Sequence, residues 1–384
     1  MIELEEVTKI YPGAAQPAVD RISLTVPAGE ICVFIGPSGC GKTTLMRLIN
    51  RLIPISAGTI RVEGKDVTTL DPIALRRHIG YVIQQVGLFP HMTVRDNIAT
   101  VTKLLGWGKP RIDARVDELL SLVNLEPKAF RDRYPRQLSG GQAQRIGVAR
   151  AMAADPPIML MDEPFGAIDP INREVLQDEF LRIQEKLRKT IIFVTHDINE
   201  AIKMGQRIAL LKDGRLVQSG VPDELLNHPA DEFVKSFVGS DRVLKRLNLL
   251  KVRDAMMPDP VRCTAGDLSE RVLEQMVKNE LAFLIVADAE GKLLGYVNQY
   301  DLRGHRGRVE QAARQLTLTV PPDRNLKEAL SLMLSYDLGI LVVVDDAGVI
   351  QGILNSTTLS KLVGTTYDEK GGHWGRITAG GRIL

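Results

Sequence analysis

Cysteine is scarce in this sequence of 384 residues, which contains only Cys32, Cys40 and Cys263. No two of them form a Cys-x-x-Cys pair, and any disulfide would leave one over, so neither a disulfide framework nor a zinc site is expected. Apolar runs, such as residues 338–344, are as long as a strand and too short to cross a bilayer. The 49 basic and 47 acidic residues nearly balance, so nothing indicates a polycation that binds nucleic acid or lipid.

A signal peptide begins with basic residues followed by an apolar stretch, whereas residues 1–6 are acidic, so no signal peptide is expected. We therefore expect a chain that stays in a reducing cytosol and meets a membrane only through partners. The hydrophobic content of 44% and charged content of 25% are those of an ordinary globular protein. The length suggests two or three domains.

Short apolar segments alternate with amphipathic helical segments over residues 1–237, which predicts an α/β domain with a parallel sheet covered on both faces. The expected buried strands are 31–35, 157–161 and 190–195, and the expected helices include 41–52 and 172–187. Residues 93–152 have a helical pattern, which we interpret as a helical subdomain inserted in the sheet domain. A polar linker is expected over 238–251.

The rest of the sequence contains an internal repeat, in which residues 281–295 match residues 338–352. Each copy has a strand, an Asp-x-x-Gly turn and a second strand, and a helical segment precedes it. A unit this small cannot bury both of its faces, so the two copies are expected to pack on each other. The expected α+β modules are 252–308 and 309–364, followed by a loose tail over 365–384.

One Gly-rich turn fits the phosphate-loop pattern GxxxxGK[ST] between a strand and a helix. Its glycines leave backbone N–H groups free to surround a phosphate, and the helix N-terminus adds a favourable dipole. Lys42 would bridge the β- and γ-phosphates, and the Thr43 hydroxyl would bind Mg²⁺. Cys40 is interpreted as a small residue that fits the turn. The predicted nucleotide-binding residues here are Gly36, Pro37, Ser38, Gly39, Cys40, Gly41, Lys42, Thr43 and Thr44.

A second pattern is the apolar strand that ends in Asp162 and Glu163. Asp162 suits Mg²⁺ binding, directly or through water, and Glu163 can polarise an attacking water. Alone, this could be an ordinary strand end. Its distance from the phosphate loop along the chain favours the catalytic interpretation.

A third pattern, Leu138-Ser139-Gly140-Gly141-Gln142, opens a predicted helix and resembles the signature motif of ABC (ATP-binding cassette) proteins. The N–H groups at such a helix start can hold an anion. With the other two patterns, it makes residues 1–237 resemble an ABC ATPase domain. In that family the signature motif faces the phosphate loop of another copy. The resemblance therefore implies a homodimer that binds and hydrolyses ATP with Mg²⁺.

Four further positions take roles from this resemblance alone. Tyr11 would stack on adenine, although such a Tyr is ordinarily part of a strand. Gln84, with Gln85 as its competitor, would sense Mg²⁺ and water. Asp169 belongs to a segment like the family's D-loop, in which Gly166 and Ile168 replace the common Ser and Leu. His196 would touch the γ-phosphate, or else be a structural histidine. The implied catalytic residues are Lys42, Gln84, Glu163 and His196, and the implied metal-binding residues are Thr43, Gln84 and Asp162.

The repeat resembles a tandem pair of CBS domains, modules that often sense adenine nucleotides or ionic conditions. The usual Gly-x-x-Ser/Thr-x-x-Asp turn is altered to Gly295, Asn298 and Asp301 in the first copy, and the second has Asn355 and no Asp. A regulatory nucleotide and a purely structural, dimerising role both remain open. The basic cluster Arg303-Gly304-His305-Arg306-Gly307-Arg308 is either a solvated loop or an anion site.

An ABC domain followed by two CBS domains resembles the ATP-binding subunits of importers for glycine betaine, carnitine, choline or proline betaine. Residues 79–94 and 161–167 are particularly similar to that family. The resemblance implies transmembrane permease subunits, an extracytoplasmic solute-binding protein and a place at the cytoplasmic face of the membrane. An importer for another small solute, and a soluble ABC ATPase not linked to transport, are the alternatives.

Overall fold

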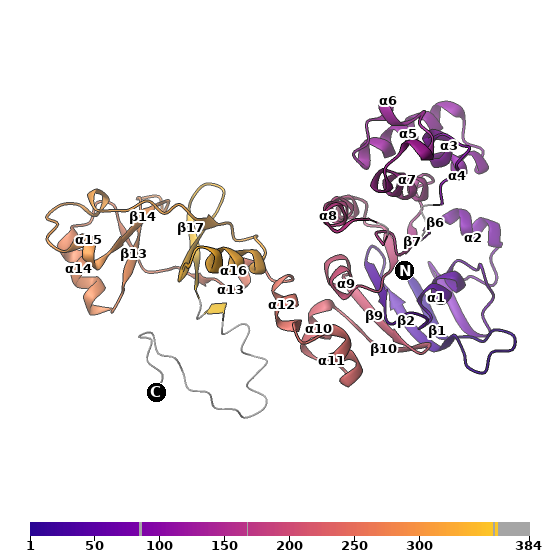
Figure 1. Ribbon diagram of the computed structural model, residues 1–384, viewed down its shortest axis with the longest axis horizontal. Helices are drawn as coiled ribbons and strands as arrows, with labels where there is room; N and C mark the ends of the chain where they lie inside the picture. The colour runs from indigo at the N-terminus through magenta and orange to yellow at the C-terminus, as the bar shows by residue number, and fades with distance from the viewer. Residues whose placement is uncertain (84–86, 167, 356–357, 360–384) are drawn as a thin grey trace. The chain divides into compact units, whose positions relative to one another are not determined.

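The computed structural model describes residues 1–83, 87–166, 168–355 and 358–359. It divides into two compact units, Met1–Ser240 and a second unit that begins at Asp241 (Figure 1). Each unit has its own apolar core, so each is described by itself.

A six-stranded sheet forms the centre of the first unit. Its strands are β3 (Ile31–Ile35), β6 (Ile79–Val82), β7 (Ile158–Asp162), β8 (Thr190–Val194), β9 (Arg207–Lys212) and β10 (Arg215–Gly220). They lie in the order β10-β9-β3-β8-β7-β6, and every neighbouring pair except β9 and β10 is parallel. Every residue of β3, β7 and β8 is buried, as expected for strands covered on both faces. The predicted parallel-sheet core is therefore confirmed.

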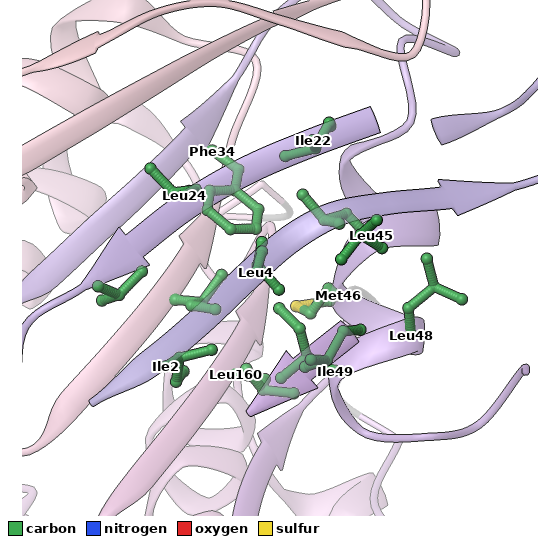
Figure 2. Packing of buried hydrophobic residues seen from close by; sticks show 14 of the residues in the cluster. Ile2, Leu4, Ile22, Leu24, Phe34, Leu45, Met46, Leu48, Ile49 and Leu160 are labelled. Atoms are coloured by element: carbon green, nitrogen blue, oxygen red, sulfur yellow. The ribbon is translucent and has the colours of Figure 1, made fainter. Parts of the chain in front are cut away.

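A smaller antiparallel sheet packs against the first through a shared core. Its strands are β1 (Ile2–Lys9), β2 (Val19–Val26), β4 (Ala57–Val62) and β5 (Lys65–Asp66), in the order β2-β1-β4-β5. Figure 2 shows Leu4 and Leu24 from this sheet close to Phe34 of β3 and Met46 of helix α1. This core holds α1, which follows the phosphate loop, against the strands that carry the other predicted site residues.

Helices surround these sheets. They are α1 (Lys42–Ile49), α2 (Pro72–His78), α3 (Val94–Ile98), α4 (Thr100–Leu104), α5 (Lys109–Leu122), α6 (Pro127–Phe130), η1 (Pro135–Gln137), α7 (Gly140–Met152), α8 (Pro170–Leu187), α9 (Ile198–Met204), α10 (Pro222–Asn227) and α11 (Glu232–Val238). Helices α3 to α7 group together at one end of the unit, which confirms the predicted helical subdomain (Figure 1). No helix within the described ranges combines the length and the apolar character needed to cross a bilayer.

The second unit contains the two copies of the repeat. Its elements are α12 (Arg242–Leu247), α13 (Val252–Ala255), β11 (Met257–Pro258), β12 (Arg262–Thr264), α14 (Ser269–Lys278), β13 (Phe283–Ala287), β14 (Leu293–Asn298), α15 (Gln299–Leu302), η2 (Val309–Gln311), β15 (Thr319–Val320), α16 (Leu326–Ser335), β16 (Ile340–Val344) and β17 (Ile350–Asn355). The sheets are β12-β13-β14 and β11-β17-β16-β15. Ile285 of one copy and Val342 of the other share a buried apolar cluster, so the copies pack together as predicted.

Some element boundaries differ from the expected ones for local reasons. The helix expected from residue 172 begins at Pro170, because Asp169 accepts a hydrogen bond from the Asn172 N–H and Pro suits a first helical position. The helix expected over 41–52 ends at Ile49. The stretch 238–251, expected to be a polar linker, contains the short helix α12.

Candidate functional site

The phosphate loop runs from the end of β3 into α1, and two of its glycines are sterically required. Gly36 has a φ of 150°, and a Cβ atom there would lie 2.1 Å from the Leu211 carbonyl oxygen. Gly41 has a φ of 105° and would place a Cβ 2.4 Å from the Ala18 carbonyl oxygen. Because the neighbouring atoms are backbone, neither site can accept a side chain without a shift of the chain. The loop therefore packs closely against the backbone at Leu211 and Ala18, which only glycine allows at these two positions.

Lys42 begins α1, and its side chain folds back over the loop. Its Nζ donates hydrogen bonds to the carbonyl oxygens of Gly36 at 2.7 Å and Pro37 at 3.0 Å. It also lies 3.6 Å from Cys40 Sγ. Cys40 is buried within the turn, as expected for a small residue that fits it. The ammonium group is thus held at the loop that would cradle a phosphate.

Thr43 and Asp162 meet where α1 faces the end of β7. The Thr43 hydroxyl donates a hydrogen bond of 3.2 Å to Asp162 Oδ1. Burial raises the pKa of the Asp162 carboxyl, and the hydrogen bond from Thr43 opposes that shift. A hydroxyl and a carboxylate beside a phosphate loop match the way Mg²⁺ is held, since it takes one or two protein ligands with phosphate oxygens and water.

Glu163 and His196 follow neighbouring parallel strands, because Asp162 of β7 pairs with Val194 of β8. Glu163 Oε1 lies 3.1 Å from His196 Nδ1. An ionised carboxylate only accepts hydrogen bonds, so the proton of this pair belongs on Nδ1. Glu163 has a φ of 45°, an uncommon left-handed conformation for a residue with a side chain, and its N–H donates to the Val194 carbonyl oxygen. The sharp turn aims the carboxylate at the histidine.

Ser139 caps α7 reciprocally, which fixes the start of the signature-like motif. The Gln142 N–H donates to Ser139 Oγ at 3.3 Å, and the Ser139 N–H donates to Gln142 Oε1 at 3.0 Å. A Cβ atom added at Gly140 would meet nothing within 4 Å, and one at Gly141 would make an ordinary contact with Leu176. The chain by itself therefore gives no steric reason for either glycine.

The remaining predicted positions are placed less directly. Tyr11 lies beyond β1, partly exposed, with Lys9 Nζ 5.2 Å from its ring centre. Asp169 caps α8 through the Asn172 N–H. Gln84 and its competitor Gln85 lie outside the described residues. The structure thus brings Lys42, Thr43, Asp162, Glu163 and His196 to one edge of the sheet, while the 139–142 motif stands at the start of α7.

One residue that the sequence analysis did not single out organises the segment 87–93, which precedes α3. Asn97 of α3 is completely buried, and its Oδ1 accepts a 2.7 Å hydrogen bond from the Phe89 N–H. Its Nδ2 donates to the carbonyl oxygens of Phe89, Met92 and Thr93. The sequence signal that could have identified Asn97 is its position between Val94 and Ile98, on the buried face of a helix.

Two buried polar side chains behind His196 were also missed. Gln177 of α8 donates a 3.0 Å hydrogen bond to Glu200 of α9. No sequence spacing links them, because the contact exists only once the two helices pack.

In the second unit, the basic cluster 303–308 is tied to α14. His305 Nδ1 lies 3.0 Å from Ser269 Oγ and accepts a 3.3 Å hydrogen bond from the Gly307 N–H. Asn298 caps α15 by accepting from the Asp301 N–H, and Asn355 accepts likewise from the Thr358 N–H. The two altered turns therefore use Asn in the same capping role.

Comparison with known families agrees with the two-unit fold. The family model described as "ABC transporter" matches residues 19–166. The family model described as "CBS domain" matches twice, at residues 252–307 and 313–364.

Individual relatives cover nearly the whole chain. The osmoprotectant import ATP-binding protein OsmV of Salmonella typhimurium is 47% identical over 353 residues, which are 91% of this chain and 92% of that protein. The glycine betaine/carnitine/choline transport ATP-binding protein OpuCA of Bacillus subtilis is 45% identical over 372 residues, covering 96% and 97%. A solved dimeric ATP-binding cassette, in a post-hydrolysis state with ADP and Pi, matches 58% of this chain and 99% of its own with a TM-score of 0.53 and 34% identity.

Proposed function

The chain belongs to the ATP-binding subunits of osmoprotectant ABC importers, and from that premise we propose that it hydrolyses ATP to drive uptake of quaternary-amine solutes. Glycine betaine, carnitine and choline are the candidate solutes, because the similar OpuCA protein of Bacillus subtilis serves the transport of these three. The observation that carries the ATPase assignment is the meeting of Thr43 with Asp162 and of Glu163 with His196 at one sheet edge.

Binding of ATP would use the phosphate loop and the residues that flank it. Backbone N–H groups between Gly36 and Thr44 would surround the β-phosphate, and Lys42 would turn from its two carbonyl partners towards the β- and γ-phosphates. Thr43 and Asp162 would hold Mg²⁺, which supplies charge neutralisation on the phosphates. Tyr11 would stack on adenine, and Gln84 would sense the metal and water.

Hydrolysis would depend on Glu163. Its carboxylate would orient the attacking water and take up its proton, while His196 would hold Glu163 in place and contact the γ-phosphate. The strained backbone of Glu163 supports this role, since such strain persists where the surrounding structure fixes a side chain for function.

A second copy of the chain would complete each ATP site. Residues Ser139, Gly140, Gly141 and Gln142 would contact the γ-phosphate bound to the other copy, and Asp169 would lie near the same boundary. Two observations support this: the open space around Gly140, and the dimeric state of a solved cassette that covers 58% of this chain. A two-fold pairing of phosphate loop and signature motif would close the dimer.

The subunit would work at the cytoplasmic face of the cell membrane, held there by permease subunits and served by an extracytoplasmic solute-binding protein. The CBS pair would regulate transport, with a nucleotide as its candidate ligand.

The test is uptake of labelled glycine betaine, choline and carnitine by cells at low and high salt. Glu163→Gln should abolish uptake, because losing a positioned base slows a reaction about 10²- to 10⁴-fold. Glu185→Gln, the same chemical change at an exposed position on α8, is the control and should leave uptake intact. Full ATP turnover by Glu163→Gln would overturn the ATPase assignment. If Glu163→Gln abolishes ATPase activity but leaves the uptake of all three solutes unchanged, the ATPase assignment stands and the substrate class is rejected.

A further inference from the structure

Behind His196 lies a group of three buried polar side chains that the proposed chemistry does not use. Gln177 comes from α8, Thr195 follows β8, and Glu200 comes from α9. Their exposed fractions are 4%, 2% and 8%. Burying a carboxylate costs free energy that apolar packing of the same volume would not, so stability alone does not explain Glu200.

Hydrogen bonds connect this group to the backbone on both sides of His196. Gln177 Nε2 donates to Glu200 Oε1 at 3.0 Å. The Thr195 hydroxyl accepts a 3.1 Å hydrogen bond from the Asp197 N–H. Its interaction with the Glu200 carboxyl lowers the pKa of that carboxyl, against the larger effect of burial. The residues immediately before and after His196 are thus joined through one hydroxyl, and Glu200 lies in the first turn of the helix that follows them.

The other end of the connection is α8, whose start carries Asp169. Asp169 caps the helix, and Arg173 in its first turn donates a 2.9 Å hydrogen bond to the Ile168 carbonyl oxygen. A helix is stiff over the two turns between Asp169 and Gln177. Movement of Ile168 and Asp169 would therefore be transmitted to Gln177 and its bond to Glu200.

We propose that Glu200 is a positioning residue that joins α8 to the segment carrying His196, so that the placement of His196 follows the position of α8. The inference rests on the proposed ATPase function, in which His196 contacts the γ-phosphate and Asp169 lies at the boundary with the second copy. It assigns to Glu200 an effect on turnover through His196, without contact with ATP.

The test compares four variants of the full chain: Glu200→Ala, Glu200→Gln, Gln177→Leu and Lys203→Ala. Lys203 is the matched control, because its exposed ion pair with Asp178 also joins α9 to α8 but does not reach Thr195. Two quantities are measured: kcat against KM for Mg–ATP, and the imidazole resonances of the six histidines after ¹³C-histidine labelling. The His196 resonance is identified by its absence from the spectrum of His196→Ala.

Glu200→Ala should lower kcat roughly 10- to 100-fold with KM changed less than about twofold, since misplacing a catalytic group affects turnover rather than binding. It should also shift the His196 resonance. Glu200→Gln should restore most activity and the resonance position, because its amide oxygen can still accept the hydrogen bond from Gln177 Nε2. Lys203→Ala should change neither quantity.

Gln177→Leu removes the hydrogen bond between α8 and Glu200 but keeps the Glu200 carboxylate. It therefore tests the same connection by kcat and by the His196 resonance if Glu200→Ala does not fold. A His196 resonance that stays in place in Gln177→Leu and in the folded Glu200 variants would overturn the proposal, as would a loss of kcat equal in Glu200→Gln and Glu200→Ala. Normal turnover by Glu163→Gln in the same assay would instead show that the proposed function itself is wrong.

Discussion

At the scale of single residues, the phosphate loop shows that a glycine can be required both for its backbone conformation and for the lack of a Cβ atom. Gly36 needs both a positive φ and the absence of a Cβ atom, because the Leu211 carbonyl oxygen occupies that place. Gly64 has a φ of 77° but open space around it. The two positions therefore share a positive φ and differ in crowding.

Gly36→Ala should lower the free energy of unfolding by about 2–5 kcal/mol, because it adds overpacking to the left-handed strain. Gly64→Ala should cost only about 1–2 kcal/mol, the strain alone. Urea unfolding of both variants measures the difference, and ATP binding should be lost only in Gly36→Ala. Equal destabilisation of the two would contradict the crowding seen at Gly36.

Glu200 gives a pH dependence whose sign follows from burial. Burial raises the pKa of this carboxyl above its ordinary value, so the folded chain holds the proton more tightly than the unfolded chain does. The resulting stability is complete below the ordinary pKa of 4.5 and is lost as pH rises through the folded-state pKa. The free energy of unfolding of Glu200→Gln, relative to that of the wild type, should therefore increase from acid to neutral pH.

Urea unfolding at several pH values checks this expectation, with Glu185→Gln as the exposed control. A difference between Glu200→Gln and wild type that stays constant across pH would show that Glu200 keeps its ordinary pKa.

At the scale of helices and loops, Asn97 fastens the segment 87–93 to α3 with four hydrogen bonds. Asn97→Ala leaves several backbone groups of that segment without these partners, and each unsatisfied buried group costs about 1–3 kcal/mol. We expect a loss of about 2–4 kcal/mol in the free energy of unfolding. Asn279→Ala, at the exposed end of α14, should change it by less than about 0.5 kcal/mol.

Increased proteolysis confined to residues 87–93 would accompany the Asn97 effect. Stability equal to that of the wild type would mean that the segment holds its conformation without Asn97.

The same scale shows what the sequence could and could not predict. The fully buried strands β3, β7 and β8 were predicted closely, because uninterrupted apolar runs and flanking turn residues define them locally. The closeness of Glu163 and His196 depends on β7 and β8 being neighbours in the sheet, and no strand order was predicted from the sequence. The Gln177–Glu200 contact depends on how α8 and α9 pack, and no local pattern contains that information.

At the scale of the whole molecule, each unit has its own buried core, one around α1 and the others in the CBS pair. Calorimetry should show two unfolding transitions. Mg–ATP added to Glu163→Gln should raise only one of them, since a ligand at about 100 times its Kd stabilises the folded state that binds it by about 2.7 kcal/mol. The unliganded protein is the reference scan. A single transition that moves as a whole would mean that the units unfold together.

The proposed completion of each ATP site by a second copy, at the open space around Gly140, has a consequence for kinetic order. When a second subunit completes the catalytic site, only paired subunits hydrolyse ATP. In dilute solution, the ATP turnover per subunit then increases with subunit concentration until all subunits are paired. A permease that holds two subunits side by side replaces that concentration with a fixed local one of about millimolar size. Attachment to the permease would then set the rate of ATP hydrolysis without adding any residue to the site. A subunit released from its permease would hydrolyse ATP more slowly, because dilution separates it from its partner.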